Sequence, residues 1–121
     1  MSTTPEGAVK AKVKKVLAKY GEELDAFWPV QNGMGTPALD CIVCYRGHHI
    51  EIETKAPGKK PTPRQEITIA KKEKAGAKVF VIDGEDGCTN LDWYLMAMAN
   101  HRFTPTQDTN KHAKDMNLEG I

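Results

Sequence analysis

Hydrophobic residues recur at two different periods along this chain, and the change of period divides it into helices and strands. After Pro5 and up to Gly21, apolar positions recur every three or four residues, as on one face of a helix. Other stretches rich in Val and Ile alternate apolar with polar residues, as in half-buried strands. The pattern predicts helices at residues 5–20, 63–75 and 88–101 and strands at residues 26–32, 38–45, 48–55 and 78–82.

Cap and turn residues support these limits. A Thr-Pro pair places a hydroxyl acceptor at the N-cap and a proline at the first helical position, where its missing N–H costs nothing. A glycine in a two-residue connection supplies the positive φ that a tight hairpin needs. The expected caps and turn are Thr4-Pro5 and Thr62-Pro63 for the first two helices, Arg46-Gly47 between the central strands, and Thr89 or Asn90 for the last helix.

The order of elements, α-β-β-β-α-β-α, predicts an α/β fold with one small mixed β-sheet flanked by helices. The step from strand 48–55 through helix 63–75 to strand 78–82 is a β-α-β unit, so these two strands should be parallel. A chain of 121 residues supports one hydrophobic core. We therefore expect a single domain over residues 1–102 and a polar C-terminal tail over residues 103–121.

Composition excludes several classes of protein. No apolar run is long enough to span a membrane, and the first residues do not resemble a secretory signal. Three cysteines, an odd number, argue against a disulfide framework and favour a cytoplasmic protein. Cys41 and Cys44 have C-x-x-C spacing, but residues three apart on a strand point to opposite faces. We interpret them as small hydrophobic residues rather than a metal or redox pair.

The net charge is only +1, yet the basic residues are concentrated in two segments. Lysines crowd the first helix from Lys10 to Lys19, and residues 55–78 carry many Lys and Arg against only Glu66 and Glu73. Such asymmetry suits a surface that meets phosphate, although a solvated lysine-rich helix face is the commoner cause.

The strand predicted at residues 48–55 carries Glu51, Glu53 and Lys55 along its polar side. If the hairpin closes symmetrically about its turn, Asp40 lies opposite Glu53, with Cβ atoms about 5 Å apart. Carboxylates this close repel unless one takes up a proton or a cation lies between them. Mg²⁺ or Mn²⁺ would remove the conflict, and Lys55 on the same face could orient water or stabilise charge on a phosphate. The alternative is a Glu–Lys ion pair beside a surface acid.

We interpret three further residues on this strand as structural. Glu51 shares the face of Glu53, and we expect it to form a buried pair with a lysine or a hydroxyl rather than to bind metal. His48 and His49 should point to opposite sides of the strand. His49 shares the face of Glu53 but lies two residue pairs away from the end of the strand that carries Glu53 and Lys55. We therefore do not favour it as a ligand or a base.

The segment GTPALDCIVCYRGHHIEIETKAPGKKPTPRQ resembles the core of the PD-(D/E)XK nuclease superfamily, and most closely its VRR-NUC type. That type is common as small phage proteins and as nuclease modules in DNA repair. The shared features are an acid after a G-x-P loop, a glycine turn, E-x-K, and a Pro/Gly loop leading to a glutamine. In this chain they are Asp40, Gly47, Glu53-Thr54-Lys55 and Gln65. One departure is that Ala38 and Leu39 separate the proline from the acid, which we interpret as a longer lead into the strand.

The resemblance covers residues 6 to about 82 and implies a restriction-endonuclease-like fold with a defined site. Asp40, Glu53 and the backbone carbonyl of Thr54 would bind Mg²⁺ or Mn²⁺. Lys55 would orient the nucleophilic water, and Gln65 would hold the phosphate or Lys55 in position. Glu6 matches the family's helix glutamate as a further ligand, with a simple first-turn acid as an equal alternative. The implied DNA contacts are Lys59, Lys60, Arg64, Lys12 and Lys15.

The function implied by the resemblance is metal-dependent hydrolysis of DNA by an endonuclease that prefers branched or otherwise structured DNA, such as Holliday junctions or flaps. The implied setting is DNA processing by a phage or mobile element, in the host cytoplasm, and a homodimer would suit two-fold symmetric junctions. One alternative is a non-catalytic nucleic-acid-binding module that retains the fold. Another is a protein-interaction domain whose acids form a structural ion cluster.

Overall fold

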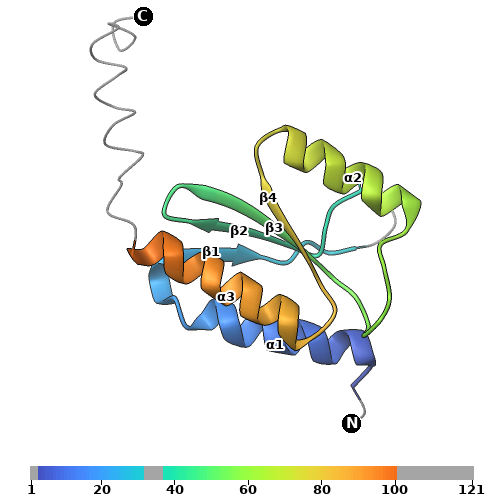
Figure 1. Cartoon of the computed structure of the whole chain (residues 1–121), viewed down its shortest axis with the longest axis horizontal. Coiled ribbons are helices and arrows are strands. Elements are labelled where there is room, and N and C mark those ends of the chain that lie inside the picture. The colour runs from blue at the N-terminus through green and yellow to red at the C-terminus, as the bar shows by residue number, and fades with distance from the viewer. Residues whose placement is uncertain (1–2, 32–36, 101–121) are drawn as a thin grey trace, which may run out of the picture.

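The computed structural model describes residues 3–31 and 37–100, which form one four-stranded sheet flanked by helices (Figure 1). The sheet order is β1-β2-β3-β4, with β1 and β4 at the edges. The elements are α1 Pro5–Ala18, a short 3₁₀ turn Gly21–Glu23, β1 Leu24–Phe27, β2 Cys41–Tyr45, β3 His48–Thr54, α2 Pro63–Lys74, β4 Lys78–Ile82 and α3 Glu85–Asn100.

The pairing of the strands agrees with the prediction in both direction and register. β1, β2 and β3 are antiparallel neighbours, and β4 joins β3 in parallel through α2. Cys41 pairs with Ile52 and Ile42 with Glu51, which is the register that brings Asp40 to the level of Glu53. Arg46 and Gly47 both have positive φ, 50° and 84°, as a two-residue hairpin turn requires. The mixed α/β fold class is therefore confirmed.

The sheet has a helical layer on each face. α1 and α3 lie side by side under one face, and α2 lies over the other (Figure 1). The apolar phase of each central strand points to the α1–α3 layer, and burial of an aliphatic side chain there contributes about 1.5–3 kcal/mol. The core consists of Val9, Val13 and Leu17 from α1, Cys41, Val43 and Tyr45 from β2, Ile50 and Ile52 from β3, Ile82 from β4, and Cys88, Leu91 and Leu95 from α3.

Helix starts agree with the predicted caps in two of three cases. The Thr4 hydroxyl accepts a hydrogen bond from the amide of Gly7, and Thr62 forms a full capping box. The third prediction is wrong, because α3 begins at Glu85 rather than near residue 88, and Thr89 and Asn90 lie exposed inside the helix.

The early start of α3 has two physical causes. Glu85 and Asp86 in its first turn complement the positive end of the helix dipole. Gly87 lets the helix lie directly on β4, since a Cβ at this position would come within 3.0–3.2 Å of Ile82 atoms.

Strand limits moved by a few residues from those predicted. β1 is Leu24–Phe27 rather than 26–32, and β2 begins at Cys41 rather than 38, so the preceding residues form the bend that carries Asp40. Cys41 is buried and Cys44 exposed, which confirms that they face opposite ways. The predicted tail, residues 103–121, lies outside the described residues. None of the helices in the described part of the chain combines the length and apolarity needed to cross a bilayer.

Candidate active site

The candidate site lies at the end of β3, on the sheet face that α2 covers. Glu53 belongs to the polar phase of β3, and its side chain is buried beneath the first turn of α2. Gln65 from that turn donates a hydrogen bond from Nε2 to Oε2 of Glu53 at 2.9 Å. The strand and the helix together therefore hold this carboxyl in one orientation.

Asp40 reaches the same point from the bend before β2. Its Oδ2 accepts two hydrogen bonds from Thr54, one from the backbone amide at 2.9 Å and one from the hydroxyl at 2.7 Å. Thr54 is itself fully buried at the end of β3, so these bonds anchor the bend to the strand. The second carboxylate is thereby fixed beside Glu53, as the hairpin register predicted.

Burial and the neighbouring charge make Glu53 hard to ionise. Burial and, next, the charge of Asp40 raise the pKa of Glu53 from 4.5 to about 7, against the opposing effect of Lys55. The fold therefore places Asp40 close to Glu53 at a buried point where Glu53 resists deprotonation. A cation at this point would relieve both the desolvation and the repulsion.

Lys55 supplies the positive charge of the site. Its Nζ lies 3.5 Å from Oε2 of Glu53, and its side chain is only 13% exposed. Its backbone amide donates to the carbonyl of Ile82 in β4 at 2.9 Å, which fixes the residue just past the end of β3. Lys55 thus shares the face of Glu53, and the ammonium is held close to the carboxyl pair.

Gln65 has partners in the structure that the sequence did not predict, and its expected contact with phosphate stays a prediction. Its Oε1 accepts from the amide of Thr62 in the capping box, while Nε2 goes to Glu53. The side chain thus contacts Glu53 rather than Lys55. Each end of this amide is used, so the start of α2 and the orientation of Glu53 depend on the same residue.

Comparison with known proteins identifies the fold. No family profile and no curated protein matches the sequence. A solved structure described as a VRR_NUC domain superposes with a TM-score of 0.59 at 24% identity, covering 84% of this chain and 100% of the other. The chain has a VRR-NUC-type nuclease fold. The carboxyl pair, lysine and glutamine described above therefore lie within a nuclease-type fold.

Glu6, matched to the VRR-NUC helix glutamate, does not join the other acids in the structure. It lies in the first turn of α1, 3.9 Å from Lys10 in an i,i+4 pair. Among the residues described, no three His, Cys, Asp or Glu side chains are grouped so that they could hold a metal. The carboxylates brought together are thus Asp40 and Glu53, and a ligand role for Glu6 stays a prediction.

The predicted DNA contacts divide between the two sides of the VRR-NUC fold. Lys59, Lys60 and Arg64 are exposed on the loop and first turn of α2 that border Glu53. Lys12 and Lys15 lie on α1, which packs on the opposite face of the sheet, and Lys12 pairs with Glu85 at 3.0 Å. The structure does not bring these two lysines to the candidate site.

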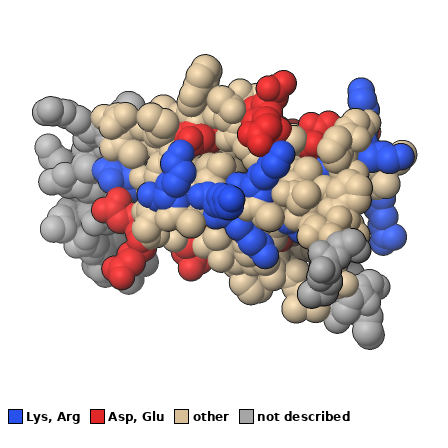
Figure 2. Space-filling model, turned by 90° about the horizontal axis from the view of Figure 1, so that it is seen from below, with Lys and Arg blue, Asp and Glu red and all other residues tan. Residues whose placement is uncertain are grey.

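The α1 side is shown in Figure 2, where Lys and Arg side chains gather in a band across the molecule with acidic side chains at its margins. Lysines of α1 and its C-cap have acidic partners: Lys10 pairs with Glu6, Lys12 with Glu85 and Lys19 with Asp92. The positive charge of α1 is therefore partly neutralised by the protein's own acids, which weakens its case as a phosphate-binding surface.

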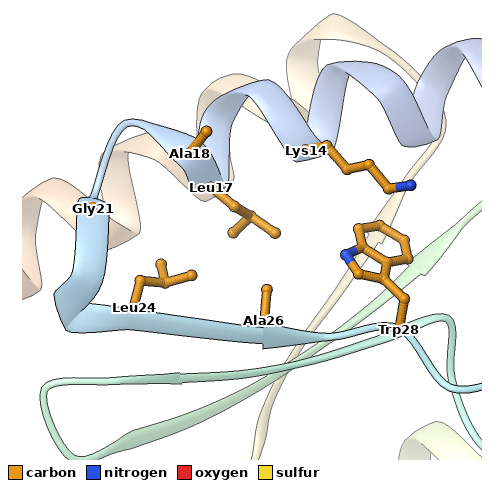
Figure 3. A pocket seen from close by; sticks show the side chains of 7 residues that line it. All are labelled: Lys14, Leu17, Ala18, Gly21, Leu24, Ala26 and Trp28. Carbon is orange, nitrogen blue, oxygen red and sulfur yellow. The ribbon is translucent and has the colours of Figure 1, made fainter.

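A hollow of about 220 Å³ lies between α1 and β1, also on that side (Figure 3). Leu17, Leu24 and Ala26 point into it, and the Nζ of Lys14 lies 5.0 Å from the centre of the Trp28 ring. None of the described side chains that line it is a carboxylate, and it lies on the other side of the sheet from the candidate active site.

A buried ion pair between Glu51 of β3 and Lys72 of α2 lies close to the site. Glu51 is completely buried, and its Oε2 lies 2.7 Å from Nε2 of His49 and 3.3 Å from Nζ of Lys72 in α2. The predicted buried pair with a lysine is thus confirmed. The alternation of polar residues in β3 predicted that Glu51 is buried and paired. Its partner Lys72 could not be predicted from local sequence, because α2 is brought over β3 only in the folded chain.

Proposed function

We propose that this protein is a metal-dependent endodeoxyribonuclease that hydrolyses phosphodiester bonds in branched or otherwise structured DNA. The observation that supports this most is the pair of fixed carboxyls, Asp40 and Glu53, with Lys55 beside them. Burial and the charge of Asp40 raise the pKa of Glu53 to about 7 even with Lys55 beside it, so the pair still favours a further positive charge. The nuclease-type fold supports the same reaction class.

The chemistry of these donors fits Mg²⁺ or Mn²⁺, both of which prefer oxygen ligands. Asp40, Glu53 and the backbone carbonyl of Thr54 would hold the ion. When bound, such an ion polarises the phosphate and makes a neighbouring water more acidic. Binding would also favour the ionised form of Glu53.

The chain's own residues have separable tasks in this proposal. Thr54 fixes Asp40 through two hydrogen bonds, and Gln65 fixes Glu53 through one. Lys55 orients the attacking water and stabilises negative charge that develops on the phosphate. Because all three act from rigid elements, little reorganisation is needed when the substrate binds.

The test is cleavage of end-labelled duplex, single-stranded, flap, splayed-arm and four-way-junction DNA with Mg²⁺, Mn²⁺ or EDTA. We expect metal-dependent cleavage by the wild type, strongest on a branched substrate, and a loss of at least a hundredfold in Glu53→Gln. Glu66→Gln, which changes an exposed acid in the same turn of α2, is the matched control and should cleave normally.

Two parallel measurements make the result decisive. Mn²⁺ should raise the Tm of the wild type but not of Glu53→Gln, because only the former retains both carboxylates. DNA binding without cleavage or a Mn²⁺ effect would instead identify a non-catalytic binding module. Light scattering with and without a four-way junction would test the homodimer that we propose for two-fold symmetric substrates.

A further inference from the structure

One side of α2 carries a basic groove that leads away from the candidate site. A hollow of about 530 Å³ lies between this helix and Pro37, and the described residues of α2 that line it are Arg64, Ile67, Thr68, Lys71 and Lys72. These five positions follow the i, i+3, i+4, i+7, i+8 spacing of one helix face. Neither acid of α2, Glu66 nor Glu73, lines the hollow. Three of the basic residues of α2 therefore line the groove and neither of its acids does.

The cations of the groove differ in how they are held. In the described part of the chain, Arg64 and Lys71 form no salt bridge, and both are exposed. Lys72 is drawn inward by the buried carboxylate of Glu51, whose Oε1 has no hydrogen-bond partner among the described residues. Glu51 thus holds Lys72 at one side of the groove, while Arg64 and Lys71 are exposed and accessible to an external anion.

The groove begins next to the carboxyl pair. Gln65 contacts Glu53, and Arg64 is the adjacent residue on the same helical turn. From Arg64 to Lys71 the helix rises by about 10 Å, so the positive charge extends along about two turns of α2. A strand with a phosphate near Lys55 would therefore meet further positive charge along α2.

The size and lining of the groove favour one strand over two. A hollow of about 530 Å³ is of the size that holds a small organic ligand, or about one or two nucleotides, so a duplex could only lie across it. Ile67 is 61% exposed within the groove and provides an apolar surface for a sugar or an unpaired base. Single-strand-binding grooves combine positive charge with a surface for the bases, usually aromatic, and here Ile67 offers an apolar contact instead of a ring.

We propose that this groove binds the unpaired strand of the DNA substrate, with Arg64 and Lys71 contacting its phosphates. The proposal rests on the proposed nuclease function for the identity of the ligand. It adds that the protein selects substrates with a single-stranded segment next to the scissile phosphate. The residues of α2 that bind this segment determine the selection.

The experiment measures DNA binding in EDTA, where no cleavage occurs, by fluorescence anisotropy with a labelled 12-nucleotide single strand and with the matching duplex. We expect the double variant Arg64→Ala/Lys71→Ala to bind the single strand about tenfold more weakly than the wild type. The slope of log K against log salt should fall by about 1.4, because each phosphate contact on a single strand contributes about 0.7. Duplex binding should change by less than threefold.

Lys74→Ala is the matched control, since it removes a lysine from the same helical turn without touching the groove. It should bind the single strand within twofold of the wild type. Equal effects of the groove and control variants, or an equal loss for duplex and single strand, would overturn the assignment. Circular dichroism of each variant shows whether α2 is intact.

Cleavage assays of the same proteins separate this proposal from the proposed function. If the groove variant selectively loses single-strand binding while the wild type cuts none of the substrates, the groove is supported and the nuclease function is refuted. Metal-dependent cleavage with unchanged binding by the groove variants would retain the nuclease and refute the groove. If both hold, the groove variants should raise KM on a flap substrate and leave kcat within twofold of the wild type.

Discussion

The raised pKa of Glu53 predicts that, without metal, the candidate site destabilises the protein as pH rises. Burial and the charge of Asp40 move the pKa of this carboxyl from 4.5 to about 7 in the folded state. Between these values the folded state binds more protons than the unfolded state, so the free energy of unfolding falls as pH increases. The decrease begins near pH 4.5 and is complete about one unit above pH 7.

The magnitude follows from the same difference. Moving a carboxyl pKa from 4.5 to about 7 corresponds to about 3 kcal/mol of differential free energy. Glu53→Gln removes the ionisation but keeps an oxygen that can accept from Gln65. Relative to wild type, the variant should therefore gain up to about 3 kcal/mol between pH 5 and pH 8.

Urea unfolding in EDTA at pH 5, 6, 7 and 8 measures this effect as the difference between wild type and variant, in which other titrations cancel. Glu66→Gln is the control, and its difference from wild type should not change over this range, because its carboxyl is exposed. A difference between wild type and Glu53→Gln that is independent of pH would refute the reasoning. Asp40→Asn should reduce the pH dependence, because it removes the second cause of the raised pKa.

Two further predictions concern hydrogen bonds that hold the fold and the site. Thr54→Val removes the hydroxyl bond to Asp40 but keeps the backbone amide bond, so it should cost about 1 kcal/mol in urea unfolding and reduce Mn²⁺ affinity at least tenfold in calorimetry. Asp92, on α3, accepts hydrogen bonds from Lys19 and from the Tyr20 hydroxyl of the segment after α1, and these lower its pKa. Its contribution is fully present above the ordinary aspartate pKa and is lost as pH falls through the lowered one, so Asp92→Asn should lower the Tm more at pH 6 than at pH 3.

Features that depend on neighbouring residues in the sequence were predictable. Alternation along residues 41–45 and 48–54 with a glycine turn between them determined the hairpin register, and the register placed Asp40 beside Glu53. Thr-Pro caps located the starts of α1 and α2 because capping involves only a few consecutive residues. The resemblance to VRR-NUC proteins rested on the same short-range spacing and agrees with the observed fold.

The start of α3 could not be read from local pattern. Its apparent caps, Thr89 and Asn90, compete with the packing of Gly87 on Ile82, and only the folded chain contains that contact. The separation of the lysines of α1 from the candidate site has the same origin, since it depends on which face of the sheet each helix covers.

By itself, the sequence determined the order of elements, the hairpin register and the identity of the acidic pair with its lysine. The tertiary structure decided that Thr54 orients Asp40, that Gln65 contacts Glu53, and that Lys72 pairs with the buried Glu51. It also decided that α2, rather than α1, presents its basic residues beside the site. The physical reason is that periodicity and capping act over a few residues, whereas contacts between a helix and a sheet depend on the packing of the whole core.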